Sequence, residues 1–60
     1  MDFEVIFSLK GKELARYQFP VVVPADIAVG VGHAMETFRI DYAEIDLLGD
    51  GLLLQIQRAD

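Results

Sequence analysis

The sequence predicts an α+β fold, in which one helix covers one face of a four-stranded mixed sheet in a two-layer β-β-α-β-β arrangement. Three observations support this prediction. Apolar and polar residues alternate in the first and the last 20 residues, each of these stretches contains a turn with glycine, and the middle of the chain has helical spacing. A chain of 60 residues has room for one domain, residues 1–60.

The N-terminal segment is predicted to form a β-hairpin. Phe3–Leu9 and Glu13–Phe19 alternate with period two, and Gly11 between them supplies the positive φ that a tight turn often requires. The inward-facing side chains are mostly apolar: Phe3, Val5, Phe7, Leu9, Ala15, Tyr17 and Phe19. Val21–Val23 lies between two prolines and is predicted to be either the end of the second strand or an extended connector.

A helix is predicted over Ile27–Arg39. Asp26 follows Pro24-Ala25 and occupies the position of an N-cap. Apolar residues then recur at spacings of 4, 3, 1 and 3, as the buried face of a helix requires: Ile27, Val31, Ala34, Met35 and Phe38. Gly30 and Gly32 each destabilise a helix by about 1 kcal/mol relative to alanine. We therefore expect a short helix that depends on packing against the sheet.

The C-terminal segment is predicted to form a second hairpin. Tyr42–Leu48 alternates and forms the third predicted strand, and Leu52–Gln57 forms the fourth. Gly49-Asp50-Gly51 between them is the strongest turn signal in the chain. The side chains predicted to face inward are Ala43, Ile45, Leu47, Leu52, Leu54 and Ile56.

The strand order predicted for the sheet is 2-1-4-3. The first and fourth strands have the densest apolar runs, Val5-Ile6-Phe7 and Leu52-Leu53-Leu54, whereas the second and third strands carry charges. Central strands are the more buried ones, and edge strands tend to be charged. The first and fourth strands are therefore expected to be adjacent and parallel. This element order resembles a minimal β-grasp fold.

Composition and charge exclude several classes of function. The net charge is −5, of which residues 1–30 contribute −1 and residues 31–60 contribute −4, so phosphate backbones are poor partners. The chain has no cysteine and one histidine, which excludes disulfides and thiolate metal sites. The N-terminus lacks the basic region of a signal peptide. These features are typical of a small cytoplasmic protein, including those encoded by phages and mobile elements.

No residue pattern supports catalysis, and we expect a non-catalytic protein without metal or cofactor. His33 has Glu36 one turn away, but such a pair is more typical of an exposed helix surface. Gly30-Val31-Gly32 starts like a dinucleotide-binding motif, yet Met35 replaces the third small residue and the segment lies inside the predicted helix. The acids near Asp50 lack the order of a calcium loop.

The open face of the predicted sheet is the best candidate for a functional surface. Counted with glycine and without tyrosine, 35 of the 60 residues are apolar, about 58%, against roughly 45–50% in soluble domains. Part of this excess falls on the uncovered face, and a contiguous apolar patch usually marks an interface. The expected partner interface combines this patch with charges at opposite edges: Ile6, Leu14, Arg16, Tyr42, Glu44, Asp46, Leu48 and Leu53. We therefore expect an interaction module that forms a homodimer through this face. The alternative is a small acidic inhibitor or decoy that binds a basic surface of another protein.

Overall fold

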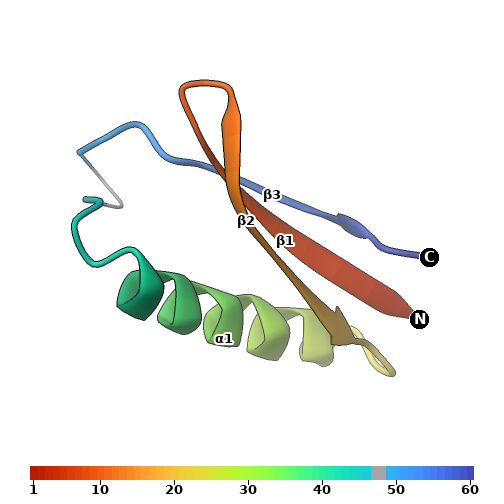
Figure 1. Cartoon of the computed structure of the whole chain (residues 1–60). Coiled ribbons are helices and arrows are strands. Elements are labelled where there is room, and N and C mark those ends of the chain that lie inside the picture. The colour runs from red at the N-terminus through yellow and green to blue at the C-terminus, as the bar shows by residue number, and fades with distance from the viewer. Residues whose placement is uncertain (47–48) are drawn as a thin grey trace.

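The computed structural model describes residues 1–46 and 49–60 as one antiparallel sheet and one helix, an α+β arrangement (Figure 1). The elements follow in the order β1 (Asp2–Leu9), β2 (Lys12–Pro20), α1 (Ala25–Asp41) and β3 (Leu53–Arg58). The sheet has three strands in the order β2-β1-β3. The prediction of four strands in a mixed sheet is therefore wrong, although the neighbours of the first strand were predicted correctly.

The predicted N-terminal hairpin is confirmed. β1 and β2 pair in an antiparallel register from Asp2 opposite Pro20 to Phe7 opposite Ala15. The register then shifts, so that Ser8 lies opposite Glu13 and Leu14 becomes an extra residue. Such a β-bulge re-aims the side chains next to it. Leu14 packs against the core, not on the outer face where simple alternation placed it.

The helix is longer than predicted at both ends, and its N-cap differs from the prediction. The N-cap residue is Pro24, without a side-chain hydrogen bond, and Asp26 lies in the first turn. The Asp26 carboxylate accepts hydrogen bonds from the backbone N–H groups of Val22 and Val23, at 2.9 and 3.1 Å. These two bonds hold the pKa of Asp26 below its usual value. Asp26 therefore fixes the connector to the helix instead of capping the helix.

Replacing Asp26 with asparagine is expected to destabilise the fold near neutral pH. A carboxyl group whose pKa is lower in the folded state stabilises above its unfolded pKa of about 3.9, and this contribution is lost as the pH falls through the folded-state pKa. The difference in urea midpoint between wild type and Asp26→Asn should therefore be present at pH 7 and shrink below about pH 4. Glu44→Gln, which neutralises another exposed carboxylate, is the control. A pH-independent difference would contradict the role assigned to the charge.

The predicted strand Tyr42–Leu48 is wrong over residues 42–46, and Leu47 and Leu48 lie outside the described residues. Tyr42 N–H donates to the carbonyl of Phe38 at 2.8 Å, and Ile45 N–H donates to the carbonyl of Tyr42 at 3.0 Å, so the chain turns. Both side chains pack against the core. The chain therefore makes one reversal fewer than predicted before β3, and β3 runs antiparallel to β1, not parallel to it.

The core lies between α1 and the sheet. Its buried residues are Val5, Phe7, Ala34 and Phe38, and the rings of Phe7 and Phe38 are stacked with centroids 4.2 Å apart. At Gly30 the ring of Phe19 occupies the space that a Cβ atom would need. This glycine lets α1 lie close to β2. The backbone of α1 lies closest to β2 and β1, and Leu54 of β3 packs against the same core.

Candidate functional site

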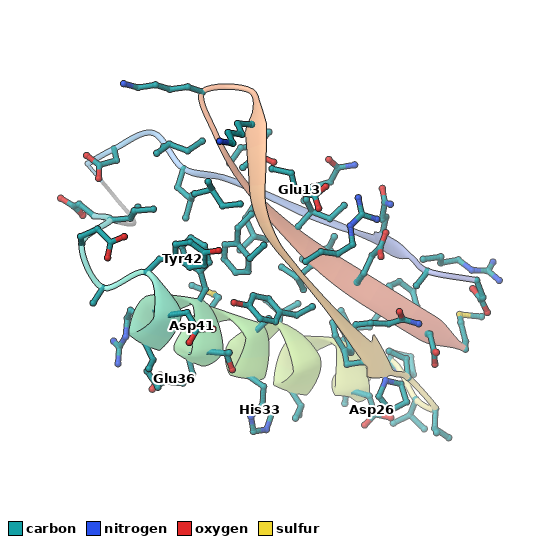
Figure 2. The ribbon with its side chains drawn as sticks, viewed as in Figure 1. Glu13, Asp26, His33, Glu36, Asp41 and Tyr42 are labelled. Carbon is teal, nitrogen blue, oxygen red and sulfur yellow. The ribbon has the colours of Figure 1, made fainter. Side chains whose placement is uncertain are left out.

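The residues of the expected interface are not brought together on one face. Ile6, Arg16 and Leu53 lie on the outer face of the sheet, which α1 does not cover. Tyr42 lies between the helix and the sheet, where its ring stacks on Phe38 at 4.7 Å and its hydroxyl donates to the carbonyl of Leu14 at 2.8 Å (Figure 2). Leu14 of β2 packs against the core. The other three residues lie after the helix: Glu44 and Asp46 are exposed and outside any strand, and Leu48 is outside the described residues.

The outer face of the sheet is a polar network and not an apolar patch. The side chain of Glu4 accepts hydrogen bonds from Arg16 at 2.8 Å and from Gln57 at 2.6 Å, although Glu4 is only 7% exposed. Arg16 also binds Glu13 at 2.8 Å, and Gln55 donates to Gln57 at 2.9 Å. These long side chains reach across all three strands. Their polar groups are paired with one another, so they do not form an apolar surface for a partner.

Ile6 and Leu53, the apolar residues of the expected interface that lie on the outer face, have separate environments. Ile6 is 6% exposed and lies between Arg16 on β2 and Gln55 on β3, whose side chains flank it. Leu53 is 62% exposed at the start of β3, opposite Ser8. One exposed leucine needs no partner to explain it. The face predicted from alternation is therefore a weak candidate for an interface.

The two free edges of the sheet are better candidates, because an edge strand has backbone groups that no neighbouring strand satisfies. For each edge strand, one hydrogen bond shows which residues direct their backbone groups outward. Ala59 N–H donates to the carbonyl of Asp2 at 2.9 Å, in register with the β1–β3 ladder. In an antiparallel ladder hydrogen-bonded pairs alternate with unbonded pairs, so Gln55 and Gln57 face β1. The N–H and C=O groups of Leu54, Ile56 and Arg58 therefore point to the free edge.

The free edge of β2 carries several features that oppose strand addition. The hydrogen bond from Val21 N–H to the carbonyl of Met1, at 2.7 Å, fixes the same alternation, so the backbone of Arg16, Gln18 and Pro20 faces outward. Pro20 has no N–H to donate. The bulge at Leu14 and the charged side chains of this strand disfavour pairing further.

The free edge of β3 has none of these features over Leu53–Gln57. This stretch contains no charged residue and no proline, and its ladder with β1 is regular. Leu53 is 62% exposed and Ile56 is 43% exposed. An uncharged, regular and exposed edge strand is the kind to which another strand is readily added. We name the outward-facing backbone of Leu54, Ile56 and Arg58 the β3 edge.

One flank of the helix carries apolar side chains that the sheet covers only in part. His33 and Thr37 line a hollow beside Tyr17 and Gln18 of β2, so the opposite flank of α1 faces the β3 side. That flank carries Ile27, Val31 and Met35, and Met35 is 40% exposed. The helix lies over β2 and β1, and this flank and Ile56 are left partly uncovered.

Sequence reasoning missed the β3 edge because it placed this strand in the middle of the sheet. The apolar run Leu52-Leu53-Leu54 was interpreted as evidence of burial on both sides, and a third strand was expected to cover the edge. The sequence feature that does point to this edge is the absence of charged residues over Leu52–Gln57. On an edge strand such a stretch indicates a docking surface and not burial.

His33 and Glu36, one turn apart on the helix, are not paired with each other. His33 is exposed and its side chain points away from the sheet (Figure 2). Glu36 accepts a hydrogen bond from Arg39 at 3.3 Å. His33 also borders a hollow of about 440 Å³ at the start of the helix, whose lining is largely apolar. Within residues 1–46 and 49–60, no three histidine or carboxylate side chains are grouped to hold a metal ion.

Comparison of the chain with protein-family models, with curated proteins and with solved structures finds no match. In the part of the chain that the structure describes, no helix has the length and apolar character needed to cross a membrane.

Proposed function

We propose that this protein is a small, non-catalytic interaction module that binds an extended polypeptide strand along the β3 edge. The observation that carries this proposal is the difference between the two edges of the sheet. Proline, charges and a bulge protect the free edge of β2, and the β3 edge presents the backbone of Leu54 and Ile56 without such protection. Main-chain hydrogen bonds to an added strand would satisfy these groups.

The side chains beside the edge favour an apolar occupant. Leu54 and Ile56 face the same side of the sheet as the core residues Phe7 and Val5, which they oppose in the ladder. A strand added at the edge would place its own inward side chains next to Leu54 and Ile56. It would bury apolar surface that α1 leaves exposed. An interaction module was also the expectation from sequence, and the β3 edge now replaces the outer face as its surface.

A synthetic peptide with the sequence of residues 50–58 serves as the probe of this function. A fluorescently labelled form is expected to bind the wild-type chain with a Kd of about 1 mM or tighter, as measured by fluorescence anisotropy. Ile56→Pro removes an outward N–H group without removing a hydrogen bond to β1. It should weaken binding about tenfold, because a ladder bond is lost and the proline ring obstructs the edge.

Gln18→Pro is the matched control, because it removes an outward N–H group from the free edge of β2. It should bind the peptide as the wild type does. Circular dichroism establishes that both variants fold. Amide hydrogen exchange of the wild type supplies a measurement without substitution: the peptide should slow exchange at Leu54 and Ile56 and leave Gln18 unchanged. Equal binding by wild type and Ile56→Pro, or no binding by the wild type, would contradict the proposal.

A second candidate function is that of an acidic decoy for a basic protein surface. The observation that favours it is the acidic stretch that starts at the last residue of the helix, in which Asp41, Glu44 and Asp50 are exposed. The ion pairs found in the described residues use other acids, namely Glu4, Glu13, Glu36 and Asp60. Binding of this kind depends on charge and not on the β3 edge, so Ile56→Pro would leave it intact.

A further inference from the structure

The turn before β3 contains an aspartate that is placed to react with its own backbone. Asp50 is followed by Gly51, both residues are exposed, and neither belongs to a helix or a strand. We infer that Asp50 is a modification site, at which the folded protein converts aspartate to isoaspartate without an enzyme. This inference does not depend on the strand-binding function proposed above. It concerns the segment through which the chain enters β3.

The conversion needs only the peptide bond and water. The backbone nitrogen of Gly51 attacks Cγ of the protonated Asp50 carboxyl group, an N–Cγ bond forms, the nitrogen loses its proton and the carboxyl OH leaves as water. The product is a cyclic imide. Water then adds to either imide carbonyl and breaks its bond to nitrogen: reaction at Cγ restores aspartate, and reaction at the original main-chain carbonyl gives isoaspartate. One water leaves and one is taken up, and nothing is oxidised or reduced.

The attacking nitrogen is accessible. Gly51 has a φ of +73°, a backbone conformation that residues with a Cβ atom rarely adopt, so the turn favours glycine at this position. A Cβ atom built there would meet nothing within 4 Å, so no neighbouring group covers the residue. Within residues 1–46 and 49–60, no hydrogen bond engages the Gly51 N–H. The conformation of the turn therefore leaves an unhindered nitrogen next to the Asp50 carboxyl group.

Asp50 is the one aspartate in the sequence that is followed by glycine. The residues that follow the other internal aspartates have large side chains, which crowd the attacking nitrogen: Phe3, Ile27, Tyr42 and Leu47. The chain contains no asparagine, so loss of ammonia from an amide side chain is not a second source of isoaspartate. Isoaspartate should therefore form mainly at residue 50.

Conversion would disrupt the turn that Asp50 closes. The backbone N–H of Asp50 donates to the carbonyl of Asp46 at 3.1 Å, and the backbone N–H of Asp46 donates to the carboxylate of Asp50 at 2.8 Å. In isoaspartate the former side chain becomes part of the main chain, which gains one carbon atom, and the carboxylate that Asp46 binds becomes an amide carbonyl. We therefore expect looser pairing at the start of β3, where Leu53 lies opposite Ser8.

Incubation of the full chain near neutral pH, in water labelled with heavy oxygen, tests this inference. Mass spectrometry with fragmentation should find isoaspartate at residue 50 at least about tenfold faster than at any other aspartate, which corresponds to about 1.4 kcal/mol in activation free energy. Each conversion should incorporate oxygen from the solvent. A peptide of residues 49–53, which has no turn to constrain it, gives the reference rate, and the folded chain should come within about tenfold of it.

Two variants separate the reaction from its structural effect. Asp50→Glu retains the charge, but its imide ring would be one atom larger, so residue 50 should stay unmodified. Asp50→Asn forms the same imide with loss of ammonia, and it should give aspartate and isoaspartate in the same ratio as the wild type. Amide hydrogen exchange at Leu53 should be faster in aged than in fresh wild type, and it should be unchanged by ageing in Asp50→Glu.

Three results would overturn the inference or its consequence. If the peptide converted and the folded chain did not, the turn would protect Asp50 and the site would not exist in the native protein. Equal rates at all aspartates would show that Gly51 gives no advantage. Aged wild type with isoaspartate at residue 50 and unchanged exchange at Leu53 would show that the turn does not hold the start of β3.

Discussion

Replacing Phe38 with alanine is expected to destabilise the protein by about 3–5 kcal/mol, the usual cost of removing a buried aromatic ring. Phe38 is 0% exposed and lies between two other rings, stacked on Phe7 at 4.2 Å and on Tyr42 at 4.7 Å. It joins the helix, the central strand and the segment that follows the helix. The cavity left by alanine would therefore affect all three, because each loses part of its packing against the other two.

The expected loss is large relative to the stability of so short a chain. At roughly 0.05–0.15 kcal/mol per residue, a domain of this size is stabilised by only about 3–9 kcal/mol. Phe38→Ala should consequently be partly or largely unfolded at 25 °C. Loss of dispersed amide signals in an NMR spectrum and a lower urea midpoint would show this.

Two substitutions control for the position and the size of the change. Ile40→Ala removes an apolar side chain that is 74% exposed on the same helix, and it should change stability by at most about 0.5 kcal/mol. Phe38→Leu retains most of the buried volume and should cost about 1–2 kcal/mol. A loss below 1 kcal/mol for Phe38→Ala would mean that the ring stack does not hold the three segments together.

Local patterns predicted the hairpin and the helix, since both depend on neighbours in sequence. The inward positions Val5 and Phe7 and the spacing of Ala34 and Phe38 on the helix agree with the observed burial, although β1 is buried on both faces over residues 4–7. The segment after the helix was predicted incorrectly because the same order of apolar residues fits a turn as well as a strand. Tyr42 and Ile45 are three residues apart, and a turn brings both of them to the core. Without that strand, β3 becomes an edge.

The candidate site was harder to predict than the fold, because it depends on contacts between distant residues. A register shift of one residue after Phe7 moved Leu14 to the core. The outer face was expected to be an apolar interface. It is polar instead, because Glu4 accepts hydrogen bonds from Arg16 of β2 and Gln57 of β3. Neither event leaves a local signal in the sequence. The sequence shows which residue types form β3, but it does not show that this strand is at an exposed edge of the sheet.

The close approach of α1 to β2 at Gly30 leads to a second strong prediction. Any side chain at this position meets the ring of Phe19, including its inner carbon atoms, which cannot swing away as the end of a flexible chain would. Gly30→Leu should gain about 1 kcal/mol in helix propensity and lose about 3 kcal/mol to overpacking. The net result is a loss of about 2 kcal/mol, or roughly 8–16 °C in Tm for a domain this small.

Gly32 provides a matched control on the same helix. A Cβ atom built there meets nothing within 4 Å, so Gly32→Leu should show only the gain in helix propensity and raise Tm. The two substitutions are chemically identical and two residues apart, and they are expected to have opposite signs. If both variants were stabilised, α1 would not lie as close to β2 as described.

A double-mutant cycle locates the cause of the loss at Gly30. Phe19→Ala removes the ring that the new side chain meets, so adding Gly30→Leu to Phe19→Ala should cost much less than adding it to the wild type. The coupling free energy should be about 1–3 kcal/mol, typical of residues in direct contact. Additive effects would show that the two positions are independent. The loss at Gly30 would then not come from contact with the ring of Phe19.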